Sequence, residues 1–258
     1  MRQRKETDKT LVVGIGEVGE PLAELLERRM PVLRLDLEPR DLTDQIGVMH
    51  ICFPFHNSAQ FTTAVVDLIR RFDPQLTIIN STVAPGTTVA VARAAGRPIC
   101  YSPVRGKHAE MAKALLHYVK FVAGTEARAV DAAVEHFKVA SMKIQRVSTP
   151  DTLELAKLAE TTYFGLCIAF AQELQRYAQV TGASYDEAVR FFEEVEFLPR
   201  QTYFPGIIGG HCVIPNIGLL LGVARSPLLE AVLDSNRRRI EEVAAEQPPS
   251  RGAGADEP

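Results

Sequence analysis

The chain lacks a long apolar segment and a strong net charge, and each absence excludes a class of protein. No apolar run reaches the roughly 18 residues of a membrane-spanning helix, and the polar residues 1–10 do not resemble a signal peptide. The formal charge of −3 and one short basic cluster, at 237–239, give no general attraction for polyanions. We therefore expect a cytoplasmic protein that binds neither membranes nor nucleic acid.

Disulfide and metal-binding patterns are also missing. The four cysteines are far apart, and none belongs to a C-x-x-C pair: Cys52, Cys100, Cys167 and Cys212. This spacing predicts neither a disulfide framework nor a cysteine zinc site. The six histidines are scattered, and His50 and His56 have no acidic or cysteine companion at ligand spacing. The sequence therefore predicts no metal site.

The first part of the chain alternates short apolar runs with helical patterns. With 46% hydrophobic residues over a length of 258, the chain can bury a sizeable core in one or two domains. The runs are mainly apolar on both of their faces, with few polar residues: 10–15, 32–37, 48–53, 76–80, 98–101, 118–123 and 142–147. Such runs, spaced by helices, indicate a parallel sheet covered on both faces. We predict an α/β fold of the doubly wound type for residues 1–149.

The pattern changes after Pro150. One helical segment is predicted over residues 151–182, with Glu154 in its first turn, and it is apolar around much of its circumference. Such a helix needs more than one partner, so we expect it to be buried in a homodimer. Further helices are predicted at 184–195 and 226–246, which gives an all-helical dimerisation and substrate domain over 150–246. The Pro, Gly and acidic residues of 247–258 predict a disordered tail.

A glycine motif stands between the first predicted strand and the first predicted helix. It has the form G-x-G-x-x-G: Gly14, Ile15, Gly16, Glu17, Val18 and Gly19. The first glycine permits a sharp turn, the second lets the backbone approach a pyrophosphate, and the third lets the helix pack on the strand. The phosphates would then meet the helix N-terminus. The motif predicts a Rossmann-type dinucleotide site, although similar glycines also occur in ordinary strand-to-helix turns.

Asp36 indicates which dinucleotide is bound. It ends the second predicted strand, about 20 residues after the motif, where a carboxylate accepts the ribose hydroxyls. A carboxylate at this point also repels a 2′-phosphate, so NAD is favoured over NADP. The alternative interpretation is a solvated acid at a strand end.

Three later segments, in this order behind the glycine motif, carry a family resemblance. They are residues 80–88, NSTVAPGTT; residues 154–174, which begin ELAKLAETTY and end AFAQEL; and residues 209–212, GGHC. Together they resemble the UDP-glucose, UDP-N-acetylhexosamine and GDP-mannose dehydrogenase family. The resemblance runs from Leu11 to about Asn236 and so covers nearly the whole chain.

The resemblance implies oxidation of a sugar alcohol to the carboxylate by two hydride transfers to NAD. It makes Cys212 the nucleophile, which traps the aldehyde as a thiohemiacetal and forms a thioester that water hydrolyses. The residues around it agree, because Gly209 and Gly210 give a substrate close access and a helix start after the cysteine would lower the thiol pKa. The alternative for Cys212 is a buried, inert thiol.

Two further groups take roles from the same resemblance. Lys157 corresponds to the lysine that stabilises the developing oxyanion, with a snorkelling surface lysine as the alternative. Thr82, preceded by Ser81, corresponds to the threonine beside the nicotinamide and the catalytic water, with a threonine that only caps a turn as the alternative.

The sequence departs from the family at the residues that handle protons. Residues 102–108 read SPVRGKH, so both of the family's acidic side chains in this segment are absent. Thr161 replaces the family's asparagine and Asn216 replaces its aspartate. Arg105, Lys107 and His108 are therefore candidates for binding an anionic substrate or for proton transfer. For His108 a plain loop histidine is the alternative.

Length is the larger departure. Members of the family carry a third, Rossmann-like domain that holds the nucleotide, whereas this sequence stops after the helix that bears Asn236. Either the substrate is not a nucleotide sugar or a partner chain supplies that domain. Two other functions stay open: a simple two-electron dehydrogenase of the β-hydroxyacid or 6-phosphogluconate type, and a non-catalytic NAD-binding subunit.

Overall fold

The computed structural model describes residues 8–36, 42–106, 110–193, 195, 203–210 and 212–246. The chain divides into two compact units, Met1–Leu158 and Ala159–Pro258. The boundary between them lies inside a long helix, whereas the sequence places the end of the first domain at residue 149, before that helix. Each unit is described by itself.

The first unit is built on a seven-stranded sheet of order β2-β1-β3-β4-β5-β6-β7. The strands are β1 (Lys9–Val13), β2 (Val32–Leu35), β3 (Ile46–Ile51), β4 (Leu76–Ile79), β5 (Ile99–Tyr101), β6 (Lys120–Gly124) and β7 (Ile144–Arg146). β1 pairs with β2 on one side and with β3 on the other, both in parallel. The chain order therefore reverses at β1, and ligands of such sheets bind outside the carboxyl ends of the strands at this switch point.

β6 runs opposite to the five strands before it. It pairs antiparallel with β5, and β7 then pairs parallel with β6. The sequence predicts parallel strands throughout, because an apolar run indicates burial on both faces but carries no information about direction. The antiparallel pairing brings Lys120, at the start of β6, to the edge of the sheet at which β5 ends.

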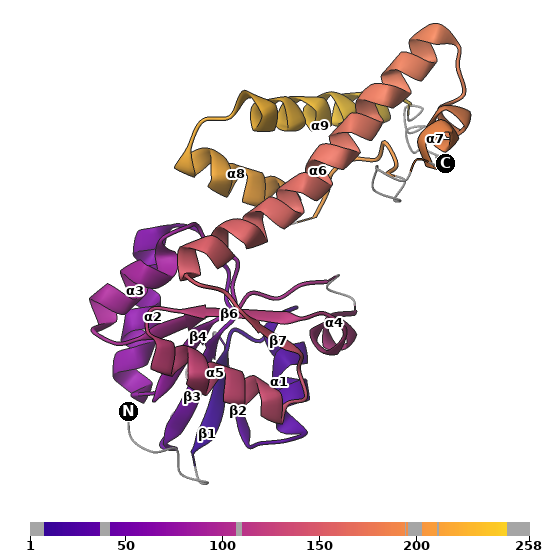
Figure 1. Ribbon diagram of the computed structural model, residues 1–258. Helices are drawn as coiled ribbons and strands as arrows, with labels where there is room; N and C mark the ends of the chain where they lie inside the picture. Colours follow the sequence, from indigo (N-terminus) through magenta and orange to yellow (C-terminus); the bar gives the residue numbers. More distant parts are fainter. Residues whose placement is uncertain are drawn as a thin grey trace, which may run out of the picture. The chain divides into compact units, whose positions relative to one another are not determined.

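Helices cover both faces of this sheet (Figure 1), as the apolar runs predict. One hydrophobic cluster joins the sheet to α1 (Gly19–Glu27), α4 (Met111–His117) and α5 (Ala127–Val139). The other joins it to α2 (Ser58–Phe72), α3 (Thr87–Ala95) and the first turn of α6 (Pro150–Thr181). Because side chains alternate along a strand, Val12 faces the first cluster while Leu11 and Val13 face the second.

The second unit is helical. It contains the remainder of α6, then α7 (Tyr185–Glu193), α8 (Val213–Val223) and α9 (Pro227–Glu246). α8 packs closely on α6 at Gly165, where an added Cβ would lie 2.5 Å from Cγ1 of Val213. The sequence predicts α6, α7 and α9, but indicates only the start of α8. Within the described part of the chain, no helix combines the length and the apolar character needed to cross a membrane.

Candidate functional site

The glycine motif forms the turn between β1 and α1. Gly14 has φ +89°, and a Cβ on it would lie 2.7 Å from the backbone nitrogen of Phe53. A Cβ on Gly19 would lie 1.8 Å from the carbonyl oxygen of Gly14, so no larger residue fits there without a backbone shift. Gly16 has open space where a Cβ would stand. The turn therefore leaves its middle accessible at the start of α1, as a bound pyrophosphate requires.

The other residues of the motif complete this turn. Ile15 and Val18 pack against the first hydrophobic cluster, while the side chain of Glu17 is exposed. Val18, at the N-cap position of α1, has no side-chain capping bond to the helix N–H groups. Glu20, in the first turn, pairs with Arg34 at 3.3 Å, which offsets the negative charge near the helix N-terminus. The shape of the turn leaves room for a phosphate at the start of α1.

The remaining cofactor candidates lie on both sides of this turn. Asp36 directly follows β2 and is exposed. Ser81 and Thr82 follow β4, and the Ser81 hydroxyl donates to the carbonyl of Phe53 at 2.6 Å. Since β2 and β4 lie on opposite sides of β1, a dinucleotide whose adenosine ribose meets Asp36 would extend toward β3, β4 and β5.

A buried chain of hydrogen bonds runs behind the carboxyl ends of β3, β4 and β5. Nε2 of His136 lies 2.9 Å from Nε2 of His50, and Nδ1 of His50 lies 2.8 Å from Oδ1 of Asn80. Nδ2 of Asn80 donates to the Ser102 carbonyl at 2.7 Å, and Nζ of Lys120 donates to the same oxygen at 2.7 Å. We call His136, His50, Asn80 and Lys120 the polar spine. All four are at most 4% exposed.

With His50 neutral, the hydrogen bonds of the polar spine fix the arrangement of its protons. Because Nδ2 of Asn80 donates to Ser102, its Oδ1 accepts the hydrogen from Nδ1 of His50. A neutral His50 then accepts at Nε2, and His136 donates from its own Nε2. Protonated His50 would donate at Nε2 as well, which requires the tautomer of His136 that accepts at Nε2. Burial lowers the pKa of His50 to about 4. The hydrogen bond to Asn80 raises this pKa, and the charge of Lys120 lowers it.

Lys120 is the charged member of the spine. Its Nζ also donates to the Pro103 carbonyl at 3.1 Å and lies 5.1 Å from the ring centre of Phe137. Burial lowers the pKa of Lys120 to about 7. Burial also raises the pKa of the neighbouring Cys52 thiol to about 12, so this thiol stays protonated. Sequence reasoning missed the polar spine. The pattern that could have indicated it is a polar residue, such as His50, inside an otherwise apolar strand.

Arg105 is the one residue of the predicted anion-binding group that the structure describes. Its guanidinium carbon lies 5.5 Å from the ring centre of Tyr118 and 5.4 Å from that of Phe121. These aromatic faces restrict the guanidinium by cation–π contact. The predicted substrate-binding residues Lys107 and His108 lie outside the described residues.

Glu154 connects the first turn of α6 to the start of α3 in the same unit. Its carboxylate is fully buried and accepts three hydrogen bonds: from the Gly86 N–H at 2.7 Å, the Thr88 N–H at 2.8 Å and the Thr88 hydroxyl at 2.6 Å. Burial raises the pKa of Glu154, while these bonds lower it. The first turn of α6 thereby caps the N-terminus of α3. Lys157, one helical turn further on, is half-buried.

The remaining predicted catalytic residues lie in the second unit. Nδ2 of Asn216 donates to the Thr161 hydroxyl at 2.8 Å, so these two predicted catalytic residues contact each other. Cys212 is half-buried, forms no disulfide and directly precedes α8. Gly210 has φ +75°, a conformation that favours glycine, and both Gly209 and Gly210 are exposed.

Buried amides hold the loop that leads to Cys212. Nε2 of Gln172 donates to the Gly206 carbonyl at 2.7 Å. Oδ1 of Asn236 accepts from the Ile208 N–H at 2.7 Å, and its Nδ2 donates to the Ile208 carbonyl at 3.2 Å. The Ser235 hydroxyl donates to Oε1 of Gln172 at 2.9 Å. Sequence reasoning did not assign this anchoring role to α6 and α9.

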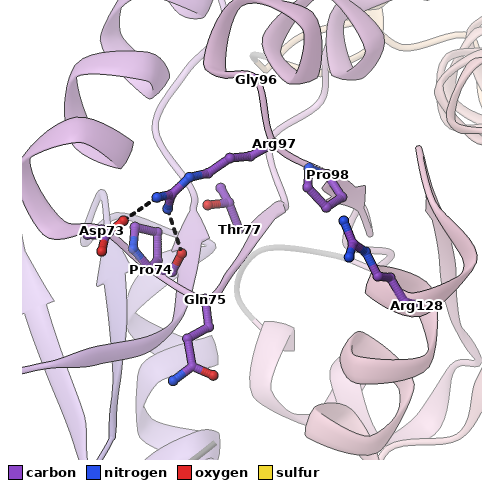
Figure 2. Close-up of a pocket in the computed structure, with 8 residues that line it drawn as sticks. All are labelled: Asp73, Pro74, Gln75, Thr77, Gly96, Arg97, Pro98 and Arg128. Carbon is purple, nitrogen blue, oxygen red and sulfur yellow. Dashed lines mark hydrogen bonds and ion pairs between the residues drawn. The ribbon is translucent and has the colours of Figure 1, made fainter. Parts of the chain in front are cut away.

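A separate pocket lies at the opposite edge of the sheet. It encloses about 270 Å³ before the amino ends of β4 and β5. Figure 2 shows Arg97 reaching across it to Asp73 and to the Pro74 carbonyl. Arg128 pairs with Glu126 at 2.7 Å, so both pocket arginines are already balanced by carboxylates. Among the described residues no group of three His, Cys, Asp or Glu side chains stands at metal-binding distance.

Comparison with known proteins identifies relatives of both units. Residues 151–238 match the UDP-glucose/GDP-mannose dehydrogenase family, central domain. UDP-N-acetyl-D-mannosamine dehydrogenase of Pyrococcus horikoshii is 28% identical over 162 residues, 58% of this chain and 38% of that protein. The enzyme of the same name from Methanocaldococcus jannaschii is 26% identical over 142 residues, 54% of this chain and 33% of that protein. The chain thus spans less than two-fifths of these curated relatives.

Solved structures show the same fold. The UDP-D-ManNAc dehydrogenase structure from Pyrococcus horikoshii superposes with a TM-score of 0.81 at 22% identity, and covers 92% of this chain and 70% of that chain. A 3-hydroxyisobutyrate dehydrogenase from Mycobacterium tuberculosis superposes with a TM-score of 0.71 at 15% identity, and covers 92% and 94%. At these identities the superpositions establish the architecture alone.

Proposed function

We propose that the chain is an NAD-dependent oxidoreductase acting on the CH–OH group of a sugar or sugar-nucleotide-like substrate, since its residues 151–238 match the central domain of the UDP-glucose/GDP-mannose dehydrogenase family. The observation that carries the proposal is the glycine turn at the switch point. It has open backbone at Gly16 and an uncapped helix start, with Asp36 at the end of the neighbouring strand. NAD, when bound, supplies the acceptor for a hydride from the alcohol carbon.

We assign a role in this work to each candidate residue. The turn at Gly16 would hold the pyrophosphate, and the Asp36 carboxylate would accept hydrogen bonds from the ribose hydroxyls. Lys157 holds its ammonium where the alcohol oxygen becomes negative, since a preorganised cation stabilises a developing oxyanion. Cys212 adds to the aldehyde, which allows a second oxidation to a thioester.

The substrate that fits the altered residues is anionic. The segment 102–108, SPVRGKH, stands where the family carries two acidic residues, so the local charge is reversed. Arg105 is held by two aromatic rings in a defined position. A guanidinium so restricted binds a carboxylate or phosphate with little loss of side-chain entropy. Asn216, which donates to the Thr161 hydroxyl, takes the place of an ionisable aspartate, so water must be activated by another group.

A two-electron dehydrogenase of the β-hydroxyacid type is the second candidate. One observation favours it: this chain spans 94% of the 3-hydroxyisobutyrate dehydrogenase that it resembles in fold. A helix lysine such as Lys157 serves this chemistry without any cysteine. The two candidates therefore differ in the need for Cys212.

Counting NADH per product tests the proposal. The purified protein is incubated with NAD and a panel of UDP- and GDP-sugars, sugar phosphates and free polyols, and both NADH and the acid formed are measured. We expect two NADH for each acid. One NADH per oxidised product would support the two-electron candidate, and tight NADH binding without turnover would identify a non-catalytic subunit. Absence of any NAD or NADH binding would contradict the proposal.

We further propose that α6 forms a homodimer. Its exposed aromatic residues Tyr163, Phe170 and Tyr177 are 51%, 64% and 68% exposed and follow one another at intervals of seven, so they lie along one face. We expect Phe170→Glu to weaken the dimer at least about tenfold by placing a charge in an apolar contact, as measured by sedimentation equilibrium. Phe191→Glu, at an exposed phenylalanine of α7, is the matched control. A wild-type monomer at high concentration would contradict this proposal.

A further inference from the structure

Lys120 is an unusual residue because its ammonium is buried and is held by carbonyl oxygens alone. It is 4% exposed, and Nζ contacts the carbonyls of Ser102 and Pro103 at 2.7 and 3.1 Å. None of the described carboxylates forms an ion pair with it. A buried charge without a counter-charge costs several kcal/mol. Lys120 satisfies the two carbonyls that follow β5, and its uncompensated charge is the property that a functional role would explain.

The place of Lys120 suggests that reason. Ser102 directly follows β5, and the shared Ser102 carbonyl joins Lys120 to Asn80, which follows β4. The ammonium thus stands behind the carboxyl ends of β4 and β5. We consider a dinucleotide whose phosphates contact the glycine turn and whose adenosine ribose contacts Asp36. The other nucleoside of such a dinucleotide extends to the side of β1 on which β3, β4 and β5 lie. That nucleoside carries the nicotinamide.

The other titratable groups around Lys120 leave its charge uncompensated. From β3 it faces His50, whose pKa is lowered by burial, and Cys52, whose pKa is raised by burial, so both are neutral. From α5 the neighbouring groups are the Phe137 ring and His136, which donates to neutral His50. From α6 the charge of Lys157 lowers the pKa of Lys120 further.

We propose that the ammonium of Lys120 makes the cofactor site favour NADH over NAD⁺. The inference rests on the proposed function, since it requires that the site bind NAD. The two cofactor forms carry the same phosphates and differ by one positive charge on the nicotinamide ring. A fixed cation nearby repels the charged ring of NAD⁺ and leaves NADH unaffected.

This bias assists oxidation of an alcohol. The alcohol carbon loses a hydride to the nicotinamide, the hydroxyl proton leaves to a base, and the products are a carbonyl compound, NADH and one proton. Transfer of the hydride cancels the ring charge, so repulsion from Lys120 is relieved as the reaction proceeds. Lys120 touches neither substrate nor cofactor in this account and is a positioning residue that acts through the field of its charge.

The ratio of the dissociation constants of NAD⁺ and NADH measures the proposed bias. NADH binding is followed by the fluorescence of NADH. The chain contains no tryptophan, so energy transfer from an indole does not contribute to this signal. NAD⁺ binding is measured by competition with NADH. At pH 6 we expect Lys120→Met to lower the ratio about tenfold, mainly through tighter NAD⁺ binding. In the wild type the ratio should fall as the pH rises through about 7, where Lys120 loses its proton, and at pH 9 the two proteins should agree.

Lys138→Met removes an exposed lysine of α5 that pairs with Glu135, and should leave the ratio unchanged. Methionine nearly matches the length of lysine without a charge to bury, so Lys120→Met should fold. Should it fail to fold, the wild-type pH profile still decides, since a flat ratio between pH 6 and 9 overturns the inference. If Lys120→Met binds both cofactors with the ratio of the wild type, the inference about Lys120 is overturned and the proposed function is not. Binding of neither cofactor to the wild type overturns the proposed function as well.

Discussion

Replacing Glu154 with alanine should lower the free energy of unfolding of the first unit by about 3 kcal/mol, because three donors then lose their only described acceptor. The Thr88 N–H and hydroxyl are fully buried, and each unsatisfied donor costs about 1–3 kcal/mol. The carboxylate also offsets the partial positive charge at the N-terminus of α3, a further fraction of a kcal/mol. Thermal and urea unfolding followed by circular dichroism measure the loss, which corresponds to roughly 10 °C in Tm.

Two variants calibrate this loss. Glu154→Gln retains one acceptor oxygen, so it should cost less than the alanine variant. Asp67→Ala removes an exposed carboxylate of α2, which pairs with Arg70 at 3.5 Å, and should change the stability by less than about 0.5 kcal/mol. An alanine variant as stable as the Asp67→Ala control would mean that water replaces the carboxylate and that Glu154 contributes nothing to the cap.

The sequence did not predict which helix the Glu154 carboxylate stabilises. Its place in the first turn of a helix predicts a favourable interaction with the dipole of its own helix, α6. The structure shows instead that the carboxylate serves α3, which is separated from it by more than sixty positions along the chain. A capping group that arrives from another element leaves no local pattern, so only the fold reveals it.

The sheet was predictable because its strands are buried on both faces. Residues such as Val48, Met49 and Ile51 are at most 3% exposed, and continuous burial of this kind produces the apolar runs that identify strands. The direction of β6 was not predictable, because burial does not depend on direction. α4 was also missed, since its seven residues give too short a pattern for a helical period to be counted.

The candidate site was predictable where local geometry demands a residue type. Gly14 and Gly19 are required by the turn itself, since any side chain would meet the backbone at 2.7 and 1.8 Å. The polar spine was not, because His50, Asn80 and Lys120 come from three strands and acquire a shared role only when the sheet forms. Residues that act through a long-range network have no spacing that a sequence pattern can match.

Replacing Cys212 with alanine should reduce acid formation by at least about 10³-fold, the scale seen when a nucleophile is removed. In the proposed mechanism the first hydride transfer does not need the thiol, so the aldehyde should still form with one NADH. The second oxidation requires a thiohemiacetal, and alanine cannot form one. The product should therefore change from an acid with two NADH to an aldehyde with one, which chromatography of the product and absorbance of NADH measure together.

Cys167→Ala is the matched control for this change. Cys167 is the other half-buried thiol of the second unit and lies within α6, so its loss should leave both the product and the NADH count as in the wild type. Unchanged NADH binding in Cys212→Ala would show that the cofactor site remains intact. Full acid formation by Cys212→Ala would contradict a covalent role for the thiol. A wild-type enzyme that stops at one NADH, with the variant equally active, would assign the chain to the two-electron dehydrogenases, in which Lys157 acts without a cysteine.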